Sequence, residues 1–199
     1  MTGVAGSGPR LGADIDGEPL RIVVVGGTGS GKSTLAAGLA VRLGLAHVEL
    51  DGLWWRAGWE HVDADALRAR LVELLDDETG WVVDGNYLDV VGLCHVWPCA
   101  DVLVWLDLPR RVGMRRAVSR TVVRCITREA LWEARLVQSA VVLSPRSLWS
   151  LWRRWPLYGL AIETAVADGR ATHMRVARLR SAREIEDWIA SFRDSASPR

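Results

Sequence analysis

Lysine is almost absent from this sequence. Lys and Arg together number 25 among 199 residues, and only Lys32 is a lysine, so the other 24 are arginines. Lysine is a compact charge on a flexible stem that can follow a phosphoryl group between its oxygens, whereas a planar guanidinium needs a fixed bidentate partner. The segment around Lys32 is therefore the first candidate for a phosphate-binding site.

A strong net charge and a long apolar run are also missing. The formal net charge is +1, so no electrostatic argument favours nucleic acid or anionic lipid as a partner. No apolar run approaches the length of a membrane span. The three cysteines form no C-x-x-C pair, and the four histidines show no metal-ligand spacing. We therefore expect a cytoplasmic protein whose cysteines are small buried residues of a reducing compartment.

The length suits one α/β domain with a sizeable core. Residues 1–19 are rich in Gly, Asp and Pro and contain no apolar signal core, which predicts a disordered tail. We expect a single domain over residues 20–194 and a frayed end over residues 195–199.

Lys32 lies in a segment, GGTGSGKST, that fits the phosphate-binding pattern G-x-x-x-x-G-K-[ST]. Glycines let the backbone wrap around phosphate oxygens, and the start of the following helix adds positive potential. Lys32 is expected to bridge the β- and γ-phosphates of ATP and Ser33 to ligate Mg²⁺. The residues expected to bind ATP are Gly26, Gly27, Thr28, Gly29, Ser30, Gly31, Lys32, Ser33 and Thr34. The G-x-G-x-x-G spacing of dinucleotide-binding loops does not fit.

Apolar patterns place this loop between a strand at residues 20–25 and a helix at 35–43. Strands and helices alternate along the rest of the chain. The other expected strands are 46–50, 81–85, 101–107 and 173–179, and the other expected helices are 63–75, 110–127, 150–167 and 182–192. Pro156 is expected to interrupt its helix near the start, and residues 128–148 are the least regular. This alternation predicts a parallel sheet between two helical layers, with ligands at the carboxyl ends of the strands.

Three further blocks, ELDGLWWRAGW, WVVDGNY and VLVWLDLPR, accompany the loop. Together with the arginine-rich helix after them, they resemble the adenylate-kinase-like P-loop proteins, and most of all a small bacterial subgroup labelled topology-modulation proteins. The resemblance runs from about Arg21 to Trp132 and again through the closing strand and helix. It implies a three-layer P-loop NTPase fold, with a parallel five-stranded sheet in the order 2-3-1-4-5. It also implies phosphoryl transfer from Mg·ATP.

Asp84 and Asp107 each end an apolar strand, and a carboxylate there can hold the waters of a bound Mg²⁺. Asp84 is favoured, because in the resemblance it matches the aspartate of the L-D-G-F-P-R block of adenylate kinases. Its alternative role is a turn residue at the end of a strand. Asp107 is expected to cap the helix that begins at Arg110.

Asp51 ends the second expected strand, on the same edge of the sheet as the phosphate loop. It could orient or deprotonate an acceptor hydroxyl, whereas a nucleoside monophosphate would need no base. The alternative is that Asp51 opens a turn before Gly52. Residues 51–62 are the expected acceptor-site segment. Its tryptophans could stack on a base, but this chain has 11 Trp against one Phe, so most are expected to be packing residues.

Four arginines recur at every fourth position along one helical face: Arg116, Arg120, Arg124 and Arg128. Such a stripe can be a solvated face. Alternatively, Arg120 and Arg124 belong to a lid-like segment, residues 120–148, and bind the phosphates of ATP. Arg116 is expected to lie too far from the loop to take part.

The leading hypothesis is an ATP-dependent kinase, with Mg²⁺ as cofactor, that acts on a nucleotide or nucleoside. A kinase of a small non-nucleotide alcohol is the close alternative. A nucleotide-binding regulator that hydrolyses ATP slowly or not at all is the alternative from another class. The sequence leaves the oligomeric state open.

Overall fold

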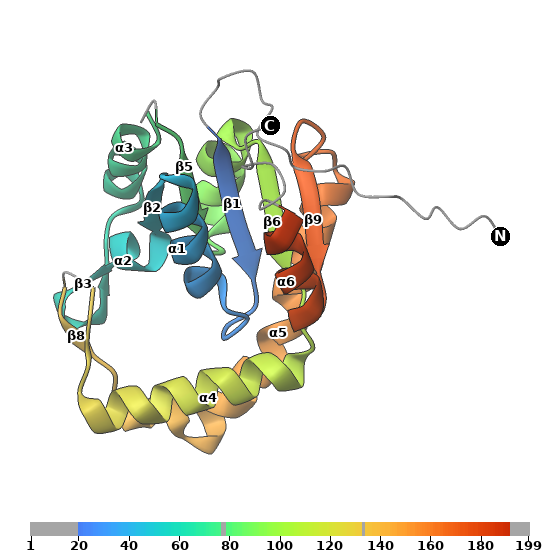
Figure 1. Cartoon of the computed structure of the whole chain (residues 1–199). Helices are drawn as coiled ribbons and strands as arrows, with labels where there is room; N and C mark the ends of the chain where they lie inside the picture. The colour runs from blue at the N-terminus through green and yellow to red at the C-terminus, as the bar shows by residue number, and fades with distance from the viewer. Residues whose placement is uncertain (1–19, 77–78, 133, 192–199) are drawn as a thin grey trace.

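Five parallel strands form the central sheet (Figure 1). The strands are β1 Arg21–Gly26, β2 Ala46–Glu49, β5 Trp81–Asp84, β6 Val102–Leu106 and β9 Arg175–Leu179. Their order is β2-β5-β1-β6-β9, and every neighbouring pair is parallel. Among the sheet strands this is the order 2-3-1-4-5, so the predicted topology is confirmed.

The computed structural model describes residues 20–76, 79–132 and 134–191. The predicted tail at residues 1–19 and the predicted frayed end at residues 195–199 lie outside these ranges.

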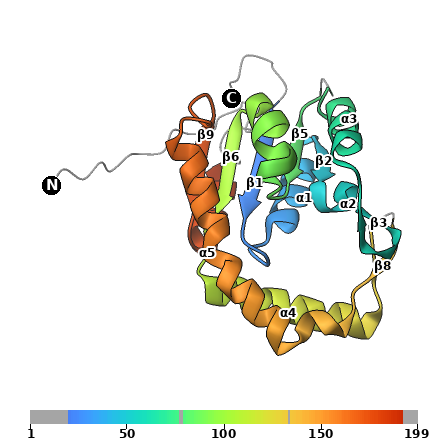
Figure 2. The ribbon, with the colours of Figure 1, turned by 180° about the vertical axis from the view of Figure 1, so that it is seen from behind.

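Helices cover both faces of the sheet (Figures 1 and 2). The helices on one face are α1 Lys32–Leu43 and α6 Ala182–Ser191, and those on the other are α3 Ala64–Leu75, the π-helix η2 Leu88–Val96 and α5 Pro145–Ala167. In β1, Ile22 and Val24 pack toward α1, whereas Val23 and Val25 pack toward α5. This alternation buries both faces of the strand and makes the three layers. The arrangement is compatible with a P-loop-like, Rossmann-type fold.

Two helices extend beyond the sheet and cross the carboxyl ends of its strands (Figures 1 and 2). The first is α4, Arg110–Thr127, and the second is the amino-terminal half of α5. Between them the chain forms the hairpin β7 Ala130–Leu131 and β8 Leu136–Val137, and then the 3₁₀ turn η4 Ala140–Leu143. The predicted lid-like segment therefore contains short regular elements.

Two short pieces complete the chain. After β2 come α2 Leu50–Trp54 and a hairpin of β3 Trp55–Arg56 and β4 Glu60–His61 around η1 Ala57–Trp59. After η2 comes the 3₁₀ turn η3 Trp97–Cys99. Asp63 caps α3, since its carboxylate accepts from the backbone N–H groups of Asp65 and Ala66.

The prediction for α5 is wrong in two respects. The helix begins at Pro145 rather than at residue 150, with the Ser144 hydroxyl accepting from the Ser147 N–H, and it continues through Pro156. Proline removes one helical hydrogen bond. The buried side chains Trp155 and Ile162, on either side of Pro156, hold the helix against the rest of the molecule.

The prediction that the cysteines are buried is also wrong. Cys94 and Cys99 are exposed and Cys125 is partly buried. The buried positions of η2 and η3 are occupied by Val91, Val96 and Trp97, so the cysteines of these turns face outward.

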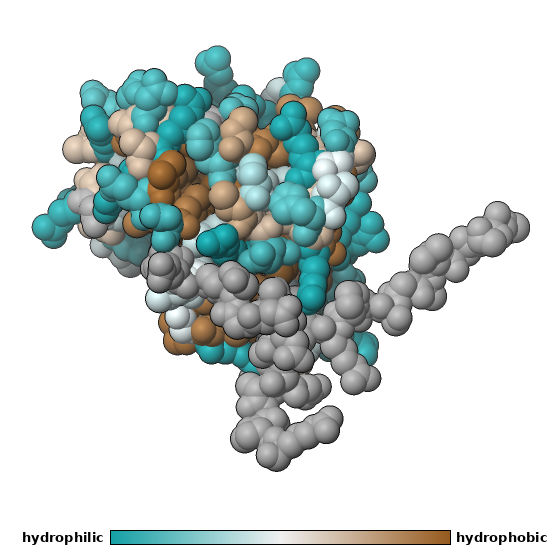
Figure 3. Space-filling view, turned by 90° about the horizontal axis from the view of Figure 1, so that it is seen from above, coloured by the Kyte–Doolittle hydropathy of each residue, from teal (hydrophilic) through white to brown (hydrophobic). Residues whose placement is uncertain are grey.

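In the described ranges, no helix combines the length and the apolar character that crossing a membrane requires. From above, on the side where the strands begin, hydrophobic residues form small patches between hydrophilic side chains (Figure 3).

Candidate functional site

The loop between β1 and α1 is held from three sides at the carboxyl edge of the sheet. The Asn86 side chain donates to the Gly26 carbonyl at 2.7 Å and accepts from the Gly26 N–H at 3.0 Å. Gly29 has φ +74°, and a Cβ there would collide with the Gly113 carbonyl of α4. The Trp155 ring of α5 lies against Gly27, where a Cβ would come within 2.6 Å of it. The loop therefore needs its glycines because α4 and α5 pack directly on it.

Lys32 is turned back into this loop. Its Nζ donates to the carbonyl oxygens of Gly26 at 3.0 Å and Gly27 at 3.2 Å. Burial lowers the pKa of Lys32, while the nearby carboxylates of Asp51 and Asp84 raise it. The ammonium thus lies on the inner side of the loop, within the field of two carboxylates.

Ser33 and Asp84, the two predicted magnesium residues, are in direct contact. The Ser33 hydroxyl donates to Asp84 Oδ2 at 2.6 Å and lies 3.4 Å from Glu49 Oε1. On the other side, His47 Nε2 is 2.9 Å from Asp84 Oδ1, and this hydrogen bond raises the pKa of His47 although burial opposes it. Burial and the charge of Asp84 raise the pKa of Glu49. Two carboxylates and a serine hydroxyl therefore meet beside the loop between β1 and α1.

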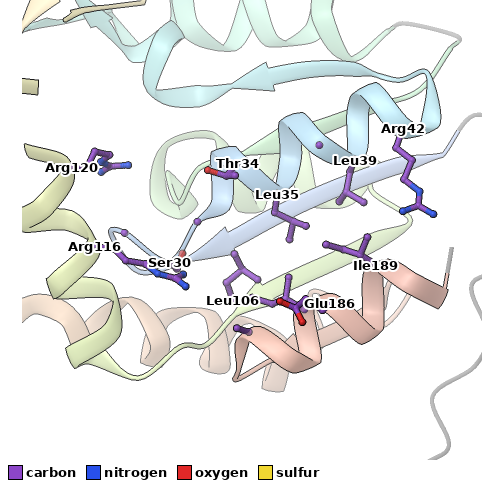
Figure 4. Close-up of a pocket in the computed structure, with 15 residues that line it drawn as sticks. Ser30, Thr34, Leu35, Leu39, Arg42, Leu106, Arg116, Arg120, Glu186 and Ile189 are labelled. Atoms are coloured by element: carbon purple, nitrogen blue, oxygen red, sulfur yellow. The ribbon is translucent and has the colours of Figure 1, made fainter. Parts of the chain in front are cut away.

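A first cavity, of about 620 Å³, opens between α1, α4 and α6 (Figure 4). At one end it is lined by loop residues 29–31 and by Arg116 and Arg120 of α4. Farther along, Leu35, Leu39 and Ile189 give it apolar walls, as the labelled side chains in Figure 4 show. The expectation that Arg116 lies too far from the loop is wrong. The small residues Gly113 and Ala117 let α4 touch the loop in the amino-terminal half of the helix, which brings Arg116 to it as well.

A second cavity, of about 560 Å³, is lined by other residues of the same loop region, Thr28 and Lys32. Its lining residues come from the loop, α2, the segment after β5 and α5: Thr28, Lys32, Asp51, Gly85, Asn86, Tyr87, Leu88, Asp89, Arg154, Leu157, Tyr158 and Ala161. Asp51 lies in α2 rather than at the end of a strand, and it lines the same cavity as Lys32. The other residues of the expected acceptor-site segment, 52–62, do not line this cavity.

Asp51 has a fixed partner in the second cavity. The Tyr87 hydroxyl donates to Asp51 Oδ1 at 2.6 Å. Burial raises the pKa of Tyr87, and the neighbouring charge of Asp51 raises it further. The phenol therefore stays protonated and remains a donor to the carboxylate.

The two predicted lid arginines have different surroundings. Burial and the charge of Arg124 lower the pKa of Arg120, while Asp51 and Glu49 raise it. Arg120 thus faces the carboxylates around the loop. Arg124 lies 3.6 Å from Glu129 instead.

The tryptophans of residues 54–59 pack on one another and on the lid-like segment. The Trp54 ring lies at a tilt to Tyr87 with 5.4 Å between the ring centroids, and Trp55 meets Trp59 edge-on at the same distance. Trp59 meets the edge of Trp132, 6.4 Å away, and the Trp132 indole donates to Glu49. Trp132, which follows β7, therefore ties the lid-like segment to the acceptor-site segment.

Asp107 does not cap α4. The residue before the helix is Pro109, and no side chain caps it. Asp107 Oδ2 instead accepts from the Arg178 guanidinium, with Nη2 at 2.8 Å and Nε at 2.9 Å. The register of β6 and β9 pairs Trp105 with Arg178, which brings the guanidinium to the end of β6.

Glu49, Asn86 and Tyr87 were missed as site residues by the sequence analysis. Glu49 is one residue before the predicted end of its strand, and the register places it beside Asp84. A search for carboxylates paired across adjacent parallel strands would have found it. Tyr87 and Asn86 stand directly after Asp84, in the WVVDGNY block.

No protein-family model and no curated protein matches this chain. Within the described ranges, no group of three or more His, Cys, Asp or Glu side chains is arranged to hold a metal ion.

Proposed function

We propose that this protein is an adenylate-kinase-like P-loop phosphotransferase that transfers the γ-phosphoryl group of Mg·ATP to a small acceptor. Nucleosides and nucleotides are the first acceptors to test. The observation that carries the proposal is the pair of cavities that meet at the phosphate loop. A kinase needs two such sites on opposite sides of the transferred group, whereas a nucleotide-binding regulator needs only one.

The chain's own residues fit a triphosphate. Lys32 offers an ammonium inside the loop, and the Ser30 hydroxyl is buried and has no hydrogen-bond partner within the described part of the chain. Both are donors that phosphate oxygens accept from. Arg116 and Arg120 extend this positive lining into the first cavity, whose apolar walls suit a base.

Ser33, with Asp84 beside it, fits Mg²⁺, which prefers oxygen ligands and keeps several of its waters. When bound, the ion neutralises charge on the phosphates. In this proposal Ser33 ligates the ion, Asp84 and Glu49 accept hydrogen bonds from its waters, and His47 holds Asp84 in place.

The first test is ATP binding by Lys32→Ala, measured by calorimetry in the presence of Mg²⁺. We expect binding to be abolished, because the loop loses its one mobile cation. Since Lys32 contacts only loop carbonyls by hydrogen bonds, the fold should remain, which circular dichroism would verify. Unchanged ATP affinity in the variant would show that the loop is not the ATP site.

The second test separates a kinase from a regulator. ADP formation is measured with nucleosides, nucleoside monophosphates and small alcohols in turn. The proposal expects one of these classes to stimulate ADP formation strongly. ATP binding without ADP formation under any condition would identify a regulator instead.

A further inference from the structure

The residues that line the second cavity indicate which kind of atom receives the phosphoryl group. This inference rests on the proposed function, in which Lys32 accompanies the transferred group. Lys32 and Asp51 both line the cavity, and Asp51 is the carboxylate whose charge acts most strongly on Lys32. The reacting atom of an acceptor in this cavity therefore lies beside Asp51.

The charges around the second cavity distinguish a phosphate oxygen from a hydroxyl oxygen as the reacting atom of the acceptor. A phosphate group carries about −1.5 to −2 charges at pH 7. Among the residues that line the second cavity, two carboxylates, Asp51 and Asp89, stand against Lys32 and the exposed Arg154. A phosphate placed beside Lys32 would face Asp51 directly, with like charges in close contact. A neutral hydroxyl meets no such repulsion and gains a hydrogen-bond acceptor.

The Asp51 carboxylate is held in a way that suits a hydroxyl. Tyr87 donates to Oδ1 at 2.6 Å, which fixes the plane of the carboxylate. Oδ2 can then accept a hydrogen bond from the hydroxyl group of the molecule that receives the phosphoryl group. The Tyr87 ring itself packs against Trp54 at a tilt. An oriented carboxylate serves a proton transfer, whereas a phosphate acceptor has no proton to give up at its attacking oxygen.

We propose that the second cavity binds an acceptor that presents a hydroxyl group, not a phosphate, with Asp51 as its general base and Tyr87 as the positioning residue. The acceptor oxygen forms a bond to the γ-phosphorus, and the bond from that phosphorus to the bridging oxygen breaks, so ADP leaves with the electron pair. The hydroxyl proton passes to Asp51 and then to solvent. Nucleosides and non-nucleotide alcohols share this chemistry, and the test separates them.

The first measurement needs no known acceptor, because water can take the place of the hydroxyl. ADP release by the full chain with saturating Mg·ATP is compared for Asp51→Asn, Tyr87→Phe and the control Asp65→Asn. Asp65 is exposed on α3, away from both cavities. We expect a loss of about a hundredfold in Asp51→Asn, which is the usual range for a general base. Tyr87→Phe should lose about tenfold in kcat without a change in the Kd for ATP, and Asp65→Asn should match the wild type.

The second measurement identifies the product. Nucleosides, small alcohols and nucleoside monophosphates are supplied separately, and ³¹P NMR distinguishes a phosphomonoester from a phosphoanhydride. A phosphomonoester is expected, from a nucleoside or from an alcohol. A phosphoanhydride formed from a nucleoside monophosphate would overturn this inference and leave the proposed function standing. Equal ADP release by Asp51→Asn and wild type would also overturn the inference alone. ATP binding without any ADP release would overturn both.

Discussion

At the scale of single residues, Arg120 has the most informative surroundings on α4. Arg120 lines the first cavity, and its charge lowers the pKa of Lys32. The charges of Asp51 and Glu49 in turn raise the pKa of Arg120. In the proposed function, Arg120 would therefore stand where negative charge develops on the transferred phosphoryl group. An arginine in such a place can contribute about a thousandfold or more to turnover. We predict that Arg120→Ala lowers acceptor-dependent turnover by at least about a hundredfold, with a much smaller change in the Kd for ATP.

The neighbouring arginines supply graded comparisons for that prediction. Arg115 is exposed on α4 and does not line either cavity, so Arg115→Ala should change turnover less than about twofold. Arg116 lines the first cavity, so Arg116→Ala should weaken ATP binding instead. Arg124 is paired with Glu129, and its removal should have a smaller effect than that of Arg120. Turnover that is equally preserved in the Arg120 and Arg115 variants would mean that the stripe is a solvated face.

The sequence predicted the contacts that depend on local pattern and strand order. Ser33, Asp84, Lys32 and Asp51 follow three strands of one parallel sheet, so their meeting at one edge was predictable. The position of Arg116 beside the loop was not predictable, because it depends on which part of α4 touches the loop. Gly113 and Ala117 determine that point, and their small size has meaning only once the loop lies against them.

At the scale of elements, the lid-like segment is joined to the rest of the site by Trp132. Its ring meets Trp59 and lies over Gly52, where a Cβ would come within 2.9 Å of it, and its indole donates to Glu49. The hairpin β7–β8 has only two residues in each strand and depends on such contacts. We predict that Trp132→Ala increases amide exchange across residues 128–140 and raises KM for the acceptor. Hydrogen exchange with mass spectrometry and steady-state kinetics would measure these effects.

Trp149→Ala is the matched control for this element. Trp149 belongs to the amino-terminal half of α5, is 61 % exposed and contacts Arg153 on its own helix. Its removal should leave exchange in the hairpin and KM unchanged. Hairpin exchange that is the same in the Trp132 variant and the wild type would show that the lid-like segment does not depend on Trp132.

Long elements with a clear period were predicted from the sequence to within a few residues, as α3 and α4 show, and the five sheet strands were predicted equally well from their apolar runs. The two small hairpins around Trp59 and Trp132 were not predicted. Their strands are too short to show alternation, and tertiary ring contacts hold them together. The beginning of α5 was also missed. Pro145 begins the helix, because proline is favourable in the first turn, whereas Pro156, which lies inside the helix, was interpreted as an interruption.

At the scale of the whole molecule, the alternation of strands and helices was enough to predict a parallel sheet between helical layers, and the resemblance to adenylate-kinase-like proteins supplied the strand order. The two cavities could not be derived in that way. They exist because α4 and α5 cross the carboxyl edge of the sheet and Trp155 wedges between the loop residue Gly27 and Gly113 of α4. The direction in which two helices leave a sheet is set by such distant contacts rather than by local pattern.

The layer formed by α3 gives a prediction for the stability of the whole molecule. Leu71 is fully buried in the core beneath the sheet, whereas its neighbour Val72 is 59 % exposed. Leu71→Ala leaves a cavity in a packed core and should lower the free energy of unfolding by about 2–5 kcal/mol. Val72→Ala should change it by less than about 0.5 kcal/mol. Chemical denaturation followed by tryptophan fluorescence would give both values, and the m-value should be the same in the two variants, since each exposes nearly the same surface on unfolding. A small, equal change in both would mean that α3 does not pack on the sheet through Leu71. A large loss confined to Leu71→Ala, with ATP affinity unchanged in the folded variant, would place the stability of the molecule in its helical layers and its ligand binding at the edge of its sheet.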